Sequence, residues 1–304
     1  MFGIHKKNKA NDAVHPVAYD GMPPEPQKKS VRMAPEMMTL VKTDMGNREY
    51  QQDAAYVSPS KVLAANKKTR IMALVCDGMG GMADGGRASR TAIEMMTKGF
   101  SKIEKMPEVD IPAFFKSGIV AIDRKIHTFP KEGGVGSGTT MVCCIAEDDM
   151  LYWASVGDSR IYIFRRGKLS QVTRDHNYWL KLKEMVAAGE ISEEEAKNHK
   201  KKEALISFLG IGNVGNGSLM DIIEKPIKLE YGDIVLLCSD GITKTLPDKQ
   251  IESIIERDEV RLEQKAEALV QAAVRANPHY QDNTTVAIMH YHEVNLKEIA
   301  SHKG

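Results

Sequence analysis

The 304-residue sequence is poor in cysteine and has no long hydrophobic run. Its four cysteines include no Cys-x-x-Cys spacing and are too few for a disulfide framework. Because they lie in or beside strand-like apolar runs, we expect them to be buried and reduced, which indicates a reducing compartment. No segment reaches the ~18 apolar residues of a membrane-spanning helix, and the N-terminus lacks the apolar core of a secretory signal. These absences predict a cytoplasmic protein.

An excess of charge of one sign is also missing. The chain has 42 basic and 41 acidic residues and a formal net charge of +1. Such a balance creates no overall field toward nucleic acid or an anionic membrane, so neither is expected as a partner. The length is enough for a substantial core in one large domain or two small ones, and nothing in the sequence demands more than a monomer.

The chain divides into three parts by composition. Residues 1–34 contain a Pro-rich segment without sustained periodicity and are expected to form a flexible arm. Residues 35–292 have a globular pattern, and residues 293–304 are expected to be a weakly ordered tail. Six apolar runs in the globular part are strand candidates: Ile71–Cys76, Thr139–Ala146, Met150–Val156, Arg160–Arg165, Ile234–Ser239 and Thr284–Tyr291.

Helical patterning occurs in blocks between these strands. Two amphipathic helices are expected after the first strand, a charged helical block follows at 177–209, and a last helical stretch covers 248–276. The short links at 147–149 and 157–159 predict that the strands on either side of each link are antiparallel neighbours. The pattern favours an α+β fold and shows no internal repeat.

Four short turns each place an aspartate at the end of a segment that reads as a buried strand. They are Asp77-Gly78, Gly157-Asp158, Asp240-Gly241 and Asp282-Asn283. Ionised carboxylates at such places are costly unless they are paired or bind a cation, and only the turn of Asp158 has an arginine nearby, Arg160. Hard oxygen ligands select Mg²⁺ or Mn²⁺ over zinc, and none of the nine histidines joins these motifs. The turns therefore predict a shared cluster of ligands around divalent metal.

Two further residues extend this cluster. Asp53 precedes a short apolar strand and lies five residues after Arg48. A guanidinium beside a metal cluster suits phosphate transfer, because it forks onto phosphate oxygens. At the first turn, Gly78 allows a conformation that a side chain would block and leaves its carbonyl free to act as a ligand.

Several other patterns are interpreted as structural. Residues 210–215 match a dinucleotide-binding fingerprint, but they follow a helical pattern and lead into a strand, so we expect a loop. Residues 133–140 lack the lysine of a phosphate-binding loop and are expected to be a flexible entry into the next strand. His290 and His292 alternate near a strand end, which is typical of a solvated face. The 17 methionines are interpreted as core filler.

In their order along the chain, the motifs resemble the metal-dependent serine/threonine protein phosphatases of type 2C, the PPM family, and its bacterial members most. The residues that carry the resemblance are Arg48, Gln52-Asp53, Asp77-Gly78-Met79, Ser137–Thr140, Gly157–Arg160, Thr173–His176, Ser239-Asp240-Gly241 and Asp282-Asn283. The match extends from Met37 to Tyr291. It implies a four-layer α/β/β/α sandwich with two central antiparallel sheets, and a flap subdomain at 177–209 beside the active cleft.

The resemblance also implies a role for each matched residue. Asp77 bridges two Mn²⁺ or Mg²⁺ ions, Gly78 offers its carbonyl to one, and Asp240 and Asp282 complete the shell of the other. Asp53 acts through metal-bound water, and Arg48 holds the phosphate of the substrate. Asp158, with Asp240, matches the ligands of a third, weaker metal site. Arg48, Asp77 and Asp240 are therefore the expected catalytic residues.

Two positions depart from the family pattern. Gln51 stands where bacterial members generally have Asn, and because the amide is kept we expect little loss. Met79 stands where eukaryotic members carry a His proposed as general acid. Many bacterial members share this methionine, so another group, such as metal-bound water, would supply the leaving-group proton.

The expected reaction is hydrolysis of phosphoserine and phosphothreonine in proteins by a metal-bridging hydroxide, without a covalent phosphoenzyme. Phosphoprotein substrates and a cognate Ser/Thr kinase are the implied partners. The alternatives are a regulatory pseudophosphatase of the same fold that binds phosphoproteins, a nucleotide-binding enzyme using residues 210–215, and an anti-sigma-type regulatory phosphatase within the family.

Overall fold

The structure is a computed structural model that describes residues 33–63, 68–80, 84–131, 136–257 and 260–296. The expected arm at 1–34 lies outside these ranges except for its last two residues, which begin the first strand. The expected tail at 293–304 is described only as far as residue 296, and its first three residues continue the last strand. No described helix is long and apolar enough to cross a membrane.

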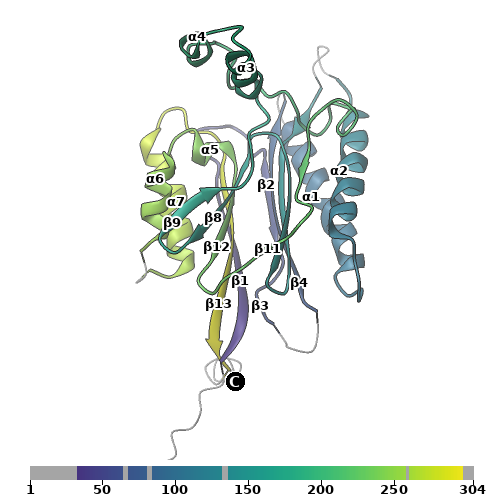
Figure 1. Cartoon of the computed structure of the whole chain (residues 1–304), viewed down its shortest axis with the longest axis vertical. Coiled ribbons are helices and arrows are strands. Elements are labelled where there is room, and N and C mark those ends of the chain that lie inside the picture. The colour runs from purple at the N-terminus through teal and green to yellow at the C-terminus, as the bar shows by residue number, and fades with distance from the viewer. Residues whose placement is uncertain (1–32, 64–67, 81–83, 132–135, 258–259, 297–304) are drawn as a thin grey trace, which may run out of the picture.

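Strands and helices alternate in blocks along the chain (Figure 1). The strands are β1 (Met33–Asp44), β2 (Asp53–Val57), β3 (Lys61–Val62), β4 (Arg70–Met79), β5 (Gly138–Thr139), β6 (Met141–Glu147), β7 (Met150–Val156), β8 (Arg160–Arg165), β9 (Lys168–Gln171), β10 (Asp221–Ile222), β11 (Ile227–Lys228), β12 (Ile234–Cys238) and β13 (Thr284–Asn295). The helices are α1 (Asp84–Ile103), α2 (Ile111–His127), α3 (Tyr178–Ala187), α4 (Glu193–Lys197), α5 (Asp240–Thr243), α6 (Asp248–Ile255) and α7 (Leu262–Ala276).

The strands form two sheets in which every pair of named strands is antiparallel. The first sheet has the order β3-β1-β13-β12-β8-β9, and the second has the order β10-β7-β6-β4-β2, with β11 beside β7 and β5 beside β4. In the first sheet, β1 and β13 pair over their full length from Met33↔Asn295 to Asp44↔Thr284. Long-range pairing therefore ties together the two ends of the described chain.

The two sheets pack face to face, and helices cover both outer faces (Figure 1). Apolar residues alternate along each central strand because successive side chains point to opposite faces. In β4, Leu74 packs under α1 and α2, whereas its neighbour Val75 packs between the sheets. In β12, Leu236 packs under α6 and α7, whereas Leu237 packs between the sheets. This alternation confirms the expected α/β/β/α sandwich.

One topological prediction was wrong. The link at 147–149 joins the antiparallel neighbours β6 and β7, as expected. The link at 157–159, however, joins β7 in the second sheet to β8 in the first, so these strands are not paired. The turn is made possible by Gly157, whose φ of +104° sends the chain across the sandwich. A short link also suits strands in two packed sheets, and link length alone does not distinguish the two cases.

All four cysteines are free and buried within the layers. Burial raises the pKa of each thiol, so the cysteines act as small apolar residues.

The two histidines of β13 differ from their expected role. The rings of His290 and His292 stack at 4.7 Å, and His290 is mostly buried against the helix layer. The end of β13 is therefore a partly buried edge of the core and not a solvated face.

The segment 210–215 forms a loop, as expected, and its backbone wraps around a side chain of α2. The N–H groups of Gly210, Gly212 and Val214 donate to the carboxylate of Asp123 at 2.8–3.1 Å. Asp123 is 2% exposed. Because an internal carboxylate already occupies this ring of donors, the loop offers no phosphate-binding site for a dinucleotide.

Candidate active site

The predicted site residues meet at one end of the sandwich. A cleft of about 430 Å³ opens where the ends of β4, β7 and β12 meet the start of β13. It is lined by Arg48, Gln52, Asp77, Gly78, Met79, Gly80, Thr140, Asp158, Glu203, Leu205, Asp240, Lys244 and Asp282. Helices α3 and α4 stand beyond this end of the sandwich (Figure 1).

Asp53 and Asp77 form a cross-strand pair at the base of the cleft. They are directly opposite in the pairing of β2 with β4. Like charges in this position repel each other, so the pair favours a cation between or beside the carboxylates. The hydroxyl of Ser239 donates to Asp53 Oδ2 at 2.7 Å and thereby connects the two sheets. The other oxygen, Oδ1, is buried and has no hydrogen-bond partner among the described residues.

Gly78 sits where the backbone comes too close for a side chain. A Cβ atom there would lie 2.2 Å from the carbonyl oxygen of Gly85 in α1. The neighbouring Asp77 is held by Thr140, whose hydroxyl accepts from the Asp77 N–H at 3.0 Å and whose own N–H donates to the Asp77 carbonyl at 2.8 Å. The local backbone is therefore held on both sides, as a ligand carbonyl at Gly78 requires.

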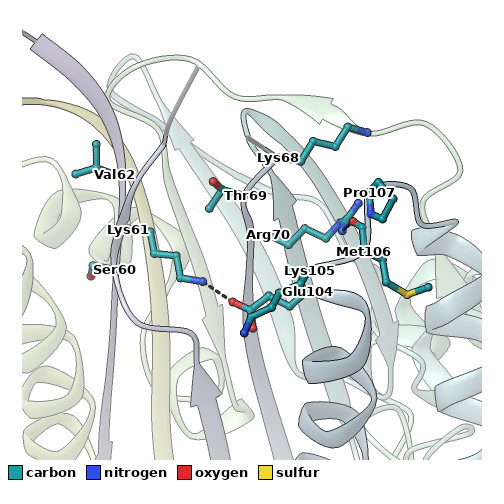
Figure 2. Close-up of a pocket in the computed structure, with 10 residues that line it drawn as sticks. All are labelled: Ser60, Lys61, Val62, Lys68, Thr69, Arg70, Glu104, Lys105, Met106 and Pro107. Carbon is teal, nitrogen blue, oxygen red and sulfur yellow. Dashed lines mark hydrogen bonds and ion pairs between the residues drawn. The ribbon is translucent and has the colours of Figure 1, made fainter. Parts of the chain in front are cut away.

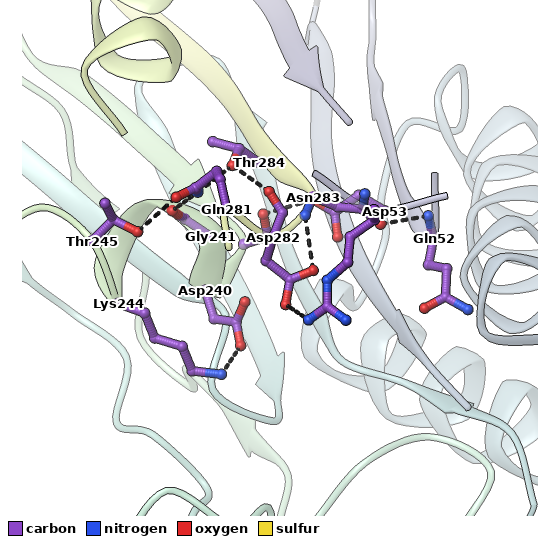
Figure 3. A network of polar contacts seen from close by, with 12 residues as sticks. Gln52, Asp53, Asp240, Gly241, Lys244, Thr245, Gln281, Asp282, Asn283 and Thr284 are labelled. Atoms are coloured by element: carbon purple, nitrogen blue, oxygen red, sulfur yellow. Dashed lines mark hydrogen bonds and ion pairs between the residues drawn. The ribbon is translucent and has the colours of Figure 1, made fainter. Parts of the chain in front are cut away.

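A hydrogen-bond network around Gln281 joins α5 to the start of β13 (Figure 3). The Gln281 amide donates to the Gly241 carbonyl and to the Thr284 hydroxyl, both at 2.7 Å. Because Gly241 follows Asp240 and Gln281 precedes Asp282, this network sets the distance between the two carboxylate-bearing turns.

The expectation that only one aspartate turn has a nearby cation was wrong. The Asp282 carboxylate accepts from Arg48 Nη2 at 2.6 Å, and the Asp240 carboxylate contacts the ammonium of Lys244. Arg160, the cation expected near Asp158, instead forms a two-pronged pair with Asp175. Lys244 lies one helical turn after Asp240, a spacing that the sequence contained, whereas the Arg48 contact spans 234 residues and has no local signal.

Asp158 is placed by the crossover between the sheets. It is 6% exposed and follows Gly157, whose N–H donates to His176 Nδ1 at 3.2 Å. The other ring nitrogen of His176 contacts Asp221 Oδ2 at 3.1 Å. His176 therefore ties the turn of Asp158 to the strand that follows the 177–209 block.

Burial, and to a smaller extent repulsion by neighbouring carboxylates, disfavours the ionisation of three aspartates at the cleft. Burial raises the pKa of Asp53 and of Asp158 to about 7 and raises the pKa of Asp77 well above its ordinary range. The negative charge of Asp240 adds to each of these three shifts. A divalent cation would reverse this effect by favouring the ionised forms.

The donor chemistry fits a hard divalent cation. The ligand candidates at the base, Asp53, Asp77 and the Gly78 carbonyl, are all oxygen donors, and one Asp53 oxygen lacks any hydrogen bond from the described residues. Among the described residues, no three His, Cys, Asp or Glu side chains are already gathered tightly enough to hold an ion unaided. Arg48 and Lys244 explain part of this, because they draw the carboxylates of Asp282 and Asp240 toward themselves.

The two departures from the family pattern have different consequences. The Gln51 side chain accepts from the Asp53 N–H at 2.9 Å and donates to Thr43 at 3.0 Å, so both ends of its amide are used. Met79 lines the cleft with an apolar side chain that has no transferable proton. Its position accordingly contributes packing only.

Glu203 and Leu205 were not singled out from the sequence, and Ser239 and Thr140 were named there only as parts of matched motifs. Ser239 and Thr140 act through hydroxyls that hold the backbone or side chain of an aspartate, as described above. Glu203 and Leu205 line the cleft from the 177–209 block. Their sequence context is an ordinary charged stretch, so only the fold could have placed them here.

A second hollow lies at the far end of β4 (Figure 2). Arg70 lines it, seven residues before Asp77, which corresponds to about 23 Å along a strand. Two of its charged side chains are paired: Lys61 contacts Glu104 (Figure 2), and Arg70 Nε donates to Glu147 at 2.7 Å. Arg70 also donates to the carbonyl of Ile103 at the end of α1. These contacts hold α1 to the sheet, and the hollow is structural.

A cleft of clustered aspartates with an arginine at its rim is typical of metal-dependent enzymes that hydrolyse phosphate esters. Residues 45–276 match the family model for protein phosphatase 2C. The serine/threonine phosphatase stp of Listeria monocytogenes is 30% identical over 229 residues, which cover 74% of this chain and 86% of the relative.

Solved structures agree with this match. The serine/threonine phosphatase of S. agalactiae superposes with a TM-score of 0.68 at 28% identity, covering 84% of this chain and 99% of the other. The catalytic domain of the phosphatase PstP, solved in complex with two manganese ions, has a TM-score of 0.64 at 25% identity, with coverages of 85% and 99%. The chain belongs to the protein phosphatase 2C family and is a metal-dependent serine/threonine protein phosphatase.

Proposed function

We propose that this phosphatase removes phosphate from phosphoserine and phosphothreonine in proteins by direct attack of water, without a covalent phosphoenzyme. The observation that carries the proposal is the cross-strand pair of Asp53, which is buried, and Asp77, which lines the cleft; one Asp53 oxygen has no hydrogen-bond partner among the described residues, and both pKa values are raised. Such a pair is stable in its ionised form only beside bound cations.

The position of each residue in the cleft suggests its role in metal binding. Asp77, the Gly78 carbonyl, Asp240 and Asp282 would hold two Mn²⁺ or Mg²⁺ ions, and Asp53 would act through coordinated water. When bound, the ions would lower the pKa of a water molecule enough to make it a nucleophile at neutral pH.

Arg48 would hold the phosphoryl group of the substrate. Its guanidinium is 58% exposed and its ion pair with Asp282 places it at the rim of the cleft. A partly solvated arginine can exchange this contact for a two-pronged contact with phosphate oxygens, which stabilises charge in the transition state.

Among the described residues, no Cys or Ser side chain lines the cleft. The four cysteines are buried within the layers, and the Ser239 hydroxyl donates to Asp53. This lining supports direct attack by water. Residues 177–209 would act as a flap that selects phosphoprotein substrates, since Glu203 and Leu205 reach the cleft from this block. A cognate Ser/Thr kinase would supply those substrates.

The test is hydrolysis of para-nitrophenyl phosphate and of a phosphothreonine peptide with Mn²⁺, with Mg²⁺ and with excess EDTA. We expect activity that requires the metal, and a loss of at least about 100-fold in Asp240→Asn because a ligand and its charge effect are removed. Asp149→Asn is the matched control, because Asp149 lies in the β6–β7 turn at the far end of the sheet and outside the cleft.

Metal-dependent turnover of Asp240→Asn near the wild-type rate would contradict the assignment of Asp240. A wild-type protein that binds metal but hydrolyses neither substrate would favour a phosphoprotein-binding pseudophosphatase.

A further inference from the structure

Lys244 is a cation built into the metal cleft. It follows the single turn of α5, so its side chain lies on the same face as Asp240 four residues earlier. Its ammonium contacts Asp240 Oδ2 (Figure 3). The side chain of Lys244 is about half exposed, whereas that of Asp240 is 13% exposed. The ammonium therefore reaches from the rim into the cleft.

The surroundings of this ammonium are acidic, because Lys244 lines the same cleft as Asp77, Asp158 and Asp240. Burial favours the neutral amine, but the negative charges of Asp240, Asp158 and Asp77 together raise the pKa of Lys244 above its ordinary value. The effect is reciprocal at Asp158, where the positive charge of Lys244 opposes the rise in pKa caused by burial and by Asp240. Lys244 thus interacts electrostatically with both Asp158 and Asp240.

The pair Asp158 and Asp240 is the one that would hold a third metal ion, outside the two-metal centre. An ammonium that contacts Asp240 and lines the same cleft as Asp158 does not fit such an ion, because a divalent cation and a fixed positive charge repel each other strongly at contact distance. The inner centre is compatible with Lys244, since the lysine contact uses only Oδ2 of Asp240 and leaves Oδ1 for an inner metal.

We propose that Lys244 is the permanent cation of the outer site, so that this phosphatase takes two metal ions and none between Asp158 and Asp240. The inference rests on the proposed two-metal function. A covalently attached ammonium supplies positive charge next to Asp158 at any metal concentration. The occupancy of this site is consequently independent of the metal supply.

The test counts bound Mn²⁺ at rising Mn²⁺ concentration, by equilibrium dialysis with elemental analysis and by loss of the free-Mn²⁺ EPR signal. We expect two ions in the wild type and three in Lys244→Met, which keeps the apolar length and removes the charge. The third ion should bind at least about tenfold more tightly in Lys244→Met than any additional ion binds to the wild type. Lys249→Met, a charge loss at an exposed position of α6, should still bind two.

Two further variants locate the third ion and guard against misfolding. Adding Asp158→Asn to Lys244→Met should remove the third ion, whereas Asp158→Asn alone should leave the count at two. Circular dichroism checks that each variant folds, and Lys244→Gln replaces Lys244→Met if the latter does not.

The outcomes separate this inference from the proposed function. Three ions in the wild type, falling to two in Asp158→Asn, would overturn the role of Lys244. Two ions in folded Lys244→Met and Lys244→Gln would overturn it as well, because the charge would not be what excludes the third ion. A wild type that binds no Mn²⁺ would instead refute the two-metal centre itself.

Discussion

At the scale of single residues, the site depends on close approaches of backbone to backbone. A Cβ at Gly78 would lie 2.2 Å from the Gly85 carbonyl oxygen, and one at Gly241 would lie 2.1 Å from the Asn283 carbonyl oxygen. Contacts this short cannot be relieved by rotating a side chain. The glycines beside Asp77 and Asp240 therefore allow the turns that bring the carboxylates of the two sheets to one cleft.

We expect Gly78→Ala to destabilise the protein by roughly 2–4 kcal/mol and to abolish most metal-dependent activity, because α1 must move away from the cleft. Gly232→Ala is the control: it has a φ of +92° but no atom within 4 Å of the added Cβ, so only backbone strain of about 1–2 kcal/mol is expected. Urea unfolding and turnover of para-nitrophenyl phosphate measure both effects. Equal loss of activity in the two variants would show that close contact at Gly78 is unimportant.

At the scale of elements, buried polar side chains attach loops to helices. The carboxylate of Asp123 on α2 accepts three backbone N–H groups from the 210–214 loop. Arg70 on β4 similarly donates a hydrogen bond to the carbonyl of Ile103 at the end of α1. Such contacts define where irregular segments lie, since apolar packing alone does not orient a loop.

We expect Asp123→Asn to lower the free energy of unfolding by roughly 2–3 kcal/mol, because an amide replaces one accepting oxygen with a donor that faces an N–H group. Asp110→Asn on the same helix is the control, since Asn caps a helix as well as Asp and the Ala113 N–H keeps its partner. Both variants should keep near wild-type turnover at low temperature. A neutral effect of Asp123→Asn on urea unfolding would contradict the role given to this carboxylate.

At the scale of the whole molecule, the core consists of three apolar layers, one between the two sheets and one under each pair of helices. Ionisable groups at the edges of these layers make the stability of the protein depend on pH. Burial, His292 and Lys265 lower the pKa of His290 to about 4. The unfolded chain protonates this histidine near its ordinary pKa of about 6.5. The neutral ring therefore contributes its full stability above pH 6.5, and that contribution is lost as the pH falls toward 4.

We expect the wild type to lose roughly 1–2 kcal/mol of stability relative to His290→Leu between pH 7 and pH 5. The difference between the two proteins isolates this histidine, because the titrating carboxylates are common to both. Urea unfolding at the two pH values measures it. A difference that stays constant with pH would mean that His290 is protonated as readily in the folded as in the unfolded protein.

Much of the fold could be predicted because its signals are local. Alternating apolar residues marked most central strands, and amphipathic spacing marked the helices that cover them. The long strand β1 was not identified, because its residues carry a weak pattern and are ordered by pairing with β13. The crossover at Gly157 was misassigned for the same reason: a three-residue link is compatible with a hairpin and with a change of sheet.

For the site, the sequence by itself determined the candidate residues: aspartates at the ends of apolar runs, with glycines that permit the turns. Only the tertiary structure decided what each carboxylate faces. The contact of Ser239 with Asp53 spans 186 residues and that of Arg48 with Asp282 spans 234. The first contact depends on the packing of two sheets and the second on the pairing of β1 with β13, neither of which a local pattern encodes. The same packing places the ammonium of Lys244 near Asp158 as well as Asp240.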